Sequence, residues 1–269
     1  GNTGPRRGPD FRNYDSVEEI IDAAYHNLDV MSRRDVSALW TCILKLMTRR
    51  DNQKRRLSKS PADDLRLKMQ TIFDNTTNGI NDCNMKELTQ TTVSMAKIVQ
   101  ILRKRAGGRR GEDAYRIVLR ELLLNEDNKT ANRELFQFIA ENSMDILHEF
   151  DARGLSNLAY AYALIEYVPK FDDGSDLLDH IALQSIEMRA EFNAQDLSNM
   201  VWAYATLKKR HDALFKAMGD QVVAHDHLRD FKPQELSNIV WAYATAAHAA
   251  PRLNAGVPLG AEGKLGSFK

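Results

Sequence analysis

The chain has 269 residues with 37 basic and 37 acidic side chains, so its formal net charge of zero provides no overall electrostatic attraction to nucleic acid or a membrane surface. Two cysteines, Cys42 and Cys83, are too few for a disulfide scaffold or a cysteine-rich zinc module. A mean hydropathy of −0.46, with no apolar run near the ~18 residues that a span needs, excludes a transmembrane helix. The chain opens with Gly1 rather than Met, from which we expect a processed or partial chain.

The two ends of the chain differ in composition from its middle. Residues 1–13 hold Gly, Pro and Arg without periodicity and are predicted to be a disordered lead, and residues 251–269 are predicted to be a disordered tail. Residues 14–250 contain only three prolines, Pro61, Pro169 and Pro233, each at an expected helix boundary. No run in this body has the alternation of β-branched residues typical of strands. The sequence therefore predicts an all-α body.

An internal repeat organises this body. Three segments match closely: FDARGLSNLAYAYAL from Phe150, FNAQDLSNMVWAYATL from Phe192 and FKPQELSNIVWAYATA from Phe231, starting 42 and 39 residues apart. Weaker copies start at Met31 and Cys83, with insertions expected around residues 50–60 and 103–130. The repeated helices are expected near residues 32–48, 84–102, 151–167, 193–209 and 232–247.

A second amphipathic helix precedes each repeated helix. These helices are expected near residues 17–28, 64–78, 131–147, 175–189 and 212–228, and a further helix near 113–124 fits the longer insertion. Since one hairpin of about 40 residues cannot bury both of its faces, stacking is required. The fold class is thus all-α, an α-solenoid of about five helical-hairpin repeats.

Each repeated helix begins with similar capping chemistry. Ser32 with Asp35, Asn84 with Glu87 and Asn193 with Asp196 resemble capping boxes, in which two side chains satisfy free backbone N–H groups. Asp151 is a fourth cap. Lys232 is a poor capping residue, partly offset by Pro233 at the first helical position.

The side of the repeated helix opposite its packing face carries a recurring polar and aromatic pattern. An amide, an aromatic ring one turn later and a small hydroxyl or a cation further on suit single-stranded RNA, because these groups can pair with a base edge, stack on a base or meet a phosphate. The alternative is that the aromatic rings pack between repeats, which the pattern favours, and that the amides join neighbouring hairpins by hydrogen bonds. The base-facing candidates are Asn157, Tyr160, Asn199, Trp202, Thr206, Asn238, Trp241 and Thr245.

Cations gather on and after the first, second and fourth repeated helices, where stacking predicts a discontinuous basic edge. Such an edge allows a neutral molecule to bind a phosphate chain in a salt-dependent way. The alternative is that these side chains are solvated and offset the helix dipole. The phosphate-binding candidates are Lys45, Arg49, Arg50, Arg55, Arg56, Lys97, Arg103, Lys104, Arg105, Arg109, Arg110, Lys208, Lys209 and Arg210.

Catalytic and metal chemistry is not indicated. No nucleophile lies in a pattern with a base, and His211, His225 and His227 lack a second group of ligands with motif spacing. We therefore expect no enzyme activity, no metal site and no cofactor.

The segments QDLSNMVWAYATL and QELSNIVWAYATA resemble the signature of octotricopeptide-repeat proteins, whose helical repeats are related to those of RAP-domain and FAST-kinase-like proteins. This resemblance implies an organellar RNA-binding solenoid, in the mitochondrion or alternatively the plastid, that acts in RNA stability, processing or translation. No nuclease-like RAP segment is recognised. Five uneven repeats fit a component of a mitochondrial ribosome, with ribosomal RNA and proteins as partners, at least as well as a regulator.

Two classes of function remain open from the sequence. The first is a single-stranded RNA-binding factor of organellar gene expression. The second is a protein–protein interaction scaffold within a larger assembly, with little direct RNA contact. No membrane partner is expected.

Overall fold

A computed structural model describes residues 8–49, 62–104, 113–127, 129–224 and 228–249. These residues form eleven α-helices and five short 3-10 helices, with two isolated bridges and no β-strand. The predicted all-α fold class is confirmed.

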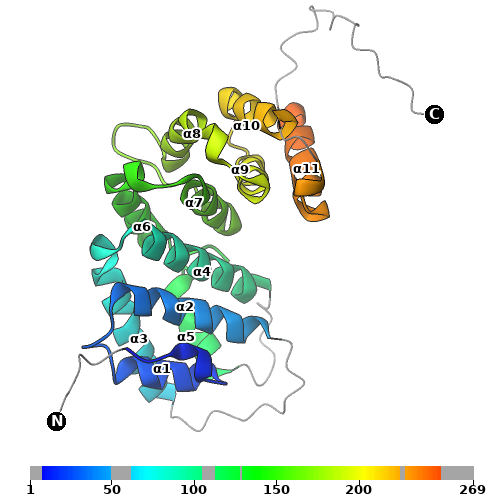
Figure 1. The fold of residues 1–269 in the computed structure, drawn as a ribbon. Helices are drawn as coiled ribbons and strands as arrows, with labels where there is room; N and C mark the ends of the chain where they lie inside the picture. The colour runs from blue at the N-terminus through cyan, green and yellow to red at the C-terminus, as the bar shows by residue number, and fades with distance from the viewer. Residues whose placement is uncertain (1–7, 50–61, 105–112, 128, 225–227, 250–269) are drawn as a thin grey trace, which may run out of the picture.

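Five helices form one continuous inner row (Figure 1). Each of them packs on the next in the order α2, α4, α7, α9 and α11. They are α2 (Arg33–Thr48), α4 (Met85–Lys104), α7 (Ala152–Ile165), α9 (Ala194–Thr206) and α11 (Pro233–Ala249). These are the repeated helices, so sequence period and spatial order coincide along the stack.

The remaining helices form an outer layer. α1 packs on α3, α3 on α5, and α10 on α8. Their bounds are α1 (Val17–Tyr25), α3 (Ala62–Asn78), α5 (Ala114–Leu123), α6 (Arg133–Asp145), α8 (Leu177–Glu187) and α10 (Asp212–Ala224). The helix α5 belongs to the longer insertion and also contacts α4.

The starts of the inner helices show the expected capping. Ser32 with Asp35 and Asn193 with Asp196 form reciprocal capping boxes. Asn84 accepts from the Glu87 N–H at 3.1 Å, and Glu87 accepts from the Asn84 N–H at the same distance. These hydrogen bonds fix where each inner helix begins, and hence which of its faces meets the neighbouring helix.

A repeated tyrosine joins the two layers. The hydroxyl of Tyr162 donates to the Phe136 carbonyl at 2.7 Å, that of Tyr204 to the Leu178 carbonyl at 2.5 Å, and that of Tyr243 to the Phe215 carbonyl at 2.6 Å. Burial raises the pKa of Tyr204 well above its usual value, so the hydroxyl stays protonated as the donor. Each of the last three repeats thus fixes its inner helix to its outer helix in the same way.

The ends of the chain differ in part from expectation. Phe11 is buried in a 3-10 helix (Phe11–Asn13) that contacts α2, so the predicted disordered lead is wrong for these residues. An apolar ring that finds a place in the core outweighs the Gly- and Pro-rich composition around it. The predicted tail, residues 251–269, and the first insertion at 50–60 lie outside the described residues.

Candidate nucleic-acid interface

The predicted aromatic candidates occupy equivalent positions on three neighbouring inner helices, and together with Lys97 on α4 we call them the aromatic strip. The rings of Tyr160 on α7 and Trp202 on α9 contact each other, with centroids 5.2 Å apart and planes tilted by 43°. The Lys97 ammonium, on α4, lies 5.8 Å from the centre of the Tyr160 ring. Trp241, the corresponding residue of α11, is 45% exposed. The rings pack between repeats and still present surface to solvent, so packing and base stacking are compatible here.

The amide candidates have different surroundings. In the described part of the chain the half-buried side chains of Asn157 and Asn199 make no hydrogen bond. Asn238 donates to the Ser198 hydroxyl at 3.5 Å and accepts from Gln234 at 2.9 Å. Two of the three amides are therefore available to a ligand, and the third contributes to the junction of α9 and α11.

The two hydroxyl candidates near the far end of the strip are both half-buried. The Thr206 hydroxyl is buried without a hydrogen-bond partner in the structure, and Thr245 lines a cavity beside α10. Thr206 thus faces the protein interior more than the strip, whereas Thr245 reaches an open space.

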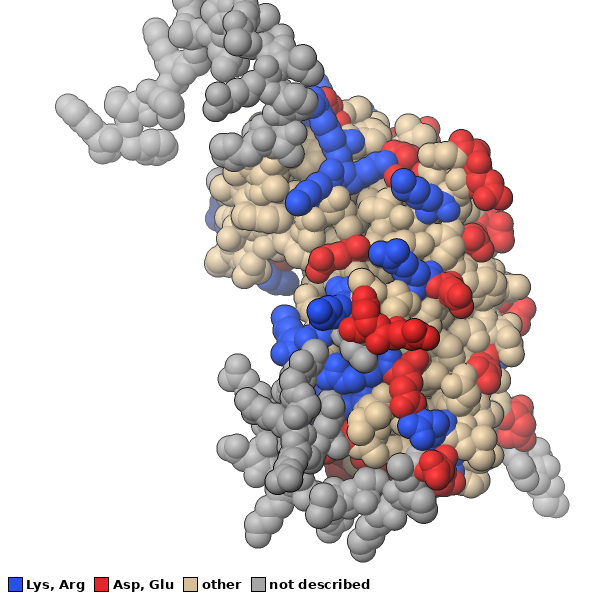
Figure 2. Space-filling view, turned by 180° about the vertical axis from the view of Figure 1, so that it is seen from behind, with Lys and Arg blue, Asp and Glu red and all other residues tan. Residues whose placement is uncertain are grey.

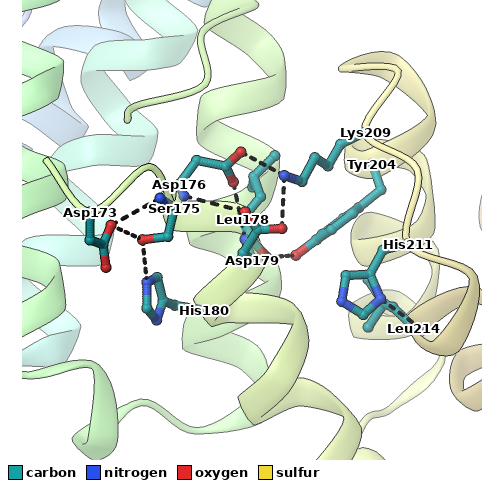
Figure 3. Close-up of polar contacts among 10 residues, drawn as sticks. All are labelled: Asp173, Ser175, Asp176, Leu178, Asp179, His180, Tyr204, Lys209, His211 and Leu214. Carbon is teal, nitrogen blue, oxygen red and sulfur yellow. Dashed lines mark hydrogen bonds and ion pairs between the residues drawn. The ribbon is translucent and has the colours of Figure 1, made fainter. Parts of the chain in front are cut away.

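Lys209 is held inside the protein by acidic side chains (Figure 3). Its ammonium lies 2.6 Å from Asp176 and 2.8 Å from Asp179, both at the start of α8. Burial lowers the pKa of Lys209, but its hydrogen bonds to the two carboxylates outweigh this effect and raise it. The prediction of Lys209 as a phosphate ligand is therefore wrong, because its charge is already neutralised where α9 meets α8.

Arg103 also has a structural role. Its guanidinium donates to the Ile165 carbonyl at 3.0 Å and lies 3.6 Å from Glu166, at the end of α7. The side chain is largely buried, so Arg103 satisfies a free carbonyl at a helix end rather than facing solvent. The prediction of a phosphate ligand here is corrected to a tie between α4 and α7.

Other cation candidates are exposed. Lys45, Lys104 and Lys208 make no ion pair in the described part of the chain, whereas Arg49 pairs loosely with Asp15 at 3.8 Å and Arg210 with Asp212 at 2.9 Å. Figure 2 shows Lys and Arg side chains in a broken band, interrupted by acidic groups. The remaining phosphate candidates, Arg50, Arg55, Arg56, Arg105, Arg109 and Arg110, lie outside the described residues.

Two inner helices end in a strained turn that the sequence did not reveal. Glu166 after α7 and Lys208 after α9 have left-handed backbones, with φ of 56° and 54°. The Lys208 N–H donates to the Ala205 carbonyl and the Lys209 N–H to the Tyr204 carbonyl, which is the Schellman arrangement. Glycine is the usual residue at this position, so the common signal for such a turn is missing.

Neither a metal centre nor a membrane span is found in the described parts of the chain. No three His, Cys, Asp or Glu side chains there could hold a metal ion, and no helix there is long and apolar enough to cross a bilayer. Of the three histidines considered, His211 accepts from the Leu214 N–H at 3.1 Å, which caps α10. His225 and His227 lie outside the described residues.

Comparison with known proteins bears on the C-terminal half. Residues 124–250 match the family model of the RNA-editing substrate-binding complex 6 protein. No curated protein matches the chain. The matched residues contain α6 to α11, which hold the three rings of the aromatic strip and the repeated tyrosines. This region is therefore similar to an RNA-related helical family, which supports the coarse expectation from the sequence but not the octotricopeptide signature in particular.

Proposed function

We propose that this protein binds single-stranded RNA along the inner face of its solenoid, without catalysing a reaction on it. The observation that carries the proposal is the strip of Lys97, Tyr160, Trp202 and Trp241, taken from four successive inner helices. Ring faces accept any base by stacking, and nearby cations meet the backbone phosphates. The matched family, whose printed name is that of an RNA-editing substrate-binding protein, supports this assignment.

The same support extends to the setting of the protein. We place it in an organellar ribonucleoprotein assembly, with the mitochondrion as the expected compartment, where RNA and protein partners act on transcripts. RNA editing, stability, processing and translation are the processes that such a surface would serve. A place in a mitochondrial ribosome belongs to the same proposal.

Binding of RNA across a salt series tests this function. The full chain should bind a mixed single-stranded RNA pool and spare duplex DNA, with affinity falling at least tenfold between about 50 and 200 mM salt. Trp202→Ala should lower RNA affinity about 5- to 100-fold, since one stacked base is lost. Leu183→Ala, on the outer helix α8 and 60% exposed, is the matched control and should change nothing. Absence of RNA binding at low salt would refute the proposal.

A second function, the protein–protein scaffold, is favoured by one surface of α11. Val201 on α9 is buried, whereas its counterpart Val240 on α11 is 69% exposed, with Ser237 and Ala244 exposed beside it. On α9 this face is covered by the next inner helix. A partner helix with small apolar residues and a polar group for Ser237 would fit there in the same way.

Val240→Lys separates the two functions. If the α11 face holds a partner helix, this charge should abolish copurification of that partner from the organelle and leave RNA affinity unchanged. If RNA binding is the main activity, Trp202→Ala should impair function in cells and Val240→Lys should not.

A further inference from the structure

A cavity of about 390 Å³ lies where α9, α10 and α11 meet. Its apolar wall includes the rings of Tyr204, Phe215 and Tyr243, and Thr245 contributes a hydroxyl. Because Thr245 follows Trp241 by four residues on α11, it lies one helical turn along the same side of the helix. The cavity therefore lies about one helical turn along α11 from Trp241.

Contacts between α10 and α11 hold the aromatic wall of the cavity in place. The Tyr243 ring meets Phe215 edge-on at 5.3 Å, and its hydroxyl is engaged by the Phe215 carbonyl. A Cβ on Gly219 would come within 2.8 Å of that hydroxyl, so glycine is what lets Tyr243 approach α10 this closely. Since the hydroxyls of Tyr204 and Tyr243 both donate to backbone carbonyls, the wall offers ring surface rather than free phenol groups.

Cationic side chains also line the cavity. Lys208, Lys209 and Arg210 all line it. Lys209 is neutralised by Asp176 and Asp179, and Arg210 shares its charge with Asp212. Lys208 is exposed, makes no ion pair among the described residues and has the strained backbone that glycine would relieve. Among these three cations, Lys208 is therefore the one whose charge no carboxylate of the described residues shares.

We infer that this cavity holds one nucleotide of the bound single-stranded RNA, with its base against the rings of Phe215 and Tyr243 and its phosphate at Lys208. The inference rests on the proposed RNA-binding function, and it adds a specific place on the protein where one nucleotide is bound. A flat, largely apolar base suits walls of aromatic ring and aliphatic side chain, and the volume lies in the range of pockets that enclose small ligands. The Thr245 hydroxyl is positioned to hydrogen-bond the base edge, and the Lys208 ammonium is a point charge suited to a phosphate.

Filling the cavity tests the inference. Thr245→Phe adds bulk to the cavity, whereas Ala244→Phe adds the same ring at the neighbouring exposed position that does not line it. With a short single-stranded RNA as the probe, Thr245→Phe should lower affinity about 5- to 100-fold, and Ala244→Phe should not. Circular dichroism confirms that each variant is folded. Thr245→Val, which removes only the hydroxyl, should have a smaller effect than Thr245→Phe and serves if that variant fails to fold.

RNA probes with a single abasic nucleotide give a second readout. The abasic position is moved along the oligonucleotide, and the affinity of each probe is measured. For the wild type, affinity should fall most when the missing base is the one that occupies the cavity. For Thr245→Phe, the probe with that position abasic should bind no more weakly than the others. If Trp202→Ala weakens binding but neither the cavity variants nor the abasic scan show this position, the cavity inference fails and the proposed function stands. If the wild-type chain does not bind RNA at all, both fail.

A free mononucleotide carries the same base and phosphate groups and is the alternative ligand for this cavity. Adenosine 5′-monophosphate and uridine 5′-monophosphate, with ribose 5-phosphate as control, are compared by ligand-observed NMR. Weak binding of the nucleotides that RNA displaces supports the inference. Tight binding of a mononucleotide that RNA does not displace would overturn it.

Discussion

The first two repeats and the last three have the same hairpin architecture but different side chains on the inner row. In the C-terminal repeats the strip positions hold Tyr160, Trp202 and Trp241, whereas the corresponding N-terminal positions hold Thr41 and Val93. At the N-terminal strip position, Thr41 contacts the Ser94 hydroxyl at 3.2 Å and accepts from Gln90 at 3.1 Å. At this position, neighbouring inner helices are thus joined by polar side chains in the N-terminal repeats and by aromatic rings in the C-terminal repeats.

The layers are also joined differently in the two regions. In the C-terminal repeats a tyrosine of the inner helix reaches a carbonyl of the outer helix, as for Tyr204 and Leu178. In the first repeat Trp40 donates instead to the Thr76 hydroxyl on α3 at 3.1 Å. The hairpin geometry therefore does not require aromatic residues on the inner face. Aromatic residues at this position in three successive repeats support the proposed RNA-binding surface.

Removing the tyrosine of the fourth repeat should have the largest effect. Tyr204→Ala should reduce the free energy of unfolding by about 3–5 kcal/mol, since a fully buried ring and its hydrogen bond are lost. Tyr243→Ala should cost less because that ring is only half-buried. Chemical denaturation measures both.

The N-terminal counterpart sharpens the comparison. Trp40→Ala should loosen α2 and α3, and hydrogen exchange should locate its effect there, whereas that of Tyr204→Ala should be found in α8 and α9. If both variants lost hydrogen-exchange protection equally throughout the chain, the conclusion that the two regions are joined separately would be wrong.

Lys209→Met should cost about 2–4 kcal/mol, because Asp176 and Asp179 would remain near each other without a cation. Burial raises the pKa of Asp179, but its hydrogen bond to Lys209 outweighs this and lowers it. A lowered carboxyl pKa means stability that is present above about pH 4 and is lost as the pH falls through the folded value.

The pH profile therefore provides the control for this variant. The wild-type protein should lose more stability than Lys209→Met on acidification from pH 6 to below about pH 4. Parallel profiles would mean that the ion pair contributes nothing to the junction of α8 and α9.

Several levels of this structure could be predicted from the sequence. The repeat fixed the order of the inner helices because matching segments must pack alike, and capping pairs such as Asn193 with Asp196 indicated where they begin. The site was less predictable. Lys208, Lys209 and Arg210 are adjacent in sequence, yet they differ in exposure and pairing because the turn after α9 directs Lys209 toward α8.

The missed features share a physical reason. The acidic partners of Lys209 lie about 30 residues away on another helix, so no local pattern shows that its charge is neutralised. The cavity beside Thr245 depends on the packing of three helices, and Lys208 occupies a turn without its usual glycine. Only the tyrosine joints had a visible signal, since Tyr162, Tyr204 and Tyr243 occupy the same place in the three close copies.

Asn199→Ala and Asn238→Ala should separate base reading from structure. Asn199 makes no hydrogen bond in the described residues, so its removal should leave stability within about 0.5 kcal/mol and relax base preference at one RNA position. Asn238 contacts Ser198 and Gln234, so its removal should lower stability slightly more. Randomised RNA selections and thermal melts provide the two readouts. An unchanged preference in Asn199→Ala would assign this amide to structure alone.

The smallest effect concerns the strained turn. Lys208→Gly should raise stability by about 0.5–1 kcal/mol, because glycine adopts the left-handed backbone without strain. It should also weaken RNA binding uniformly across sequences and reduce the salt slope by about 1. Glu166→Gly relieves the same strain one repeat earlier but also removes the carboxylate beside Arg103, so it should stabilise less than Lys208→Gly and should leave RNA affinity unchanged. Equal RNA affinity of Lys208→Gly and the wild type would remove Lys208 from the interface.

Mapping the residues that contact RNA tests directly whether the inner row is the RNA-binding surface. After ultraviolet cross-linking of a single-stranded RNA to the full chain, mass spectrometry identifies the modified peptides. Adducts are expected at Tyr160, Trp202 and Trp241 on the inner row, and none at Trp40 or on the exposed outer faces of α8 and α10. Adducts confined to the outer helices, with none on α7, α9 and α11, would contradict it.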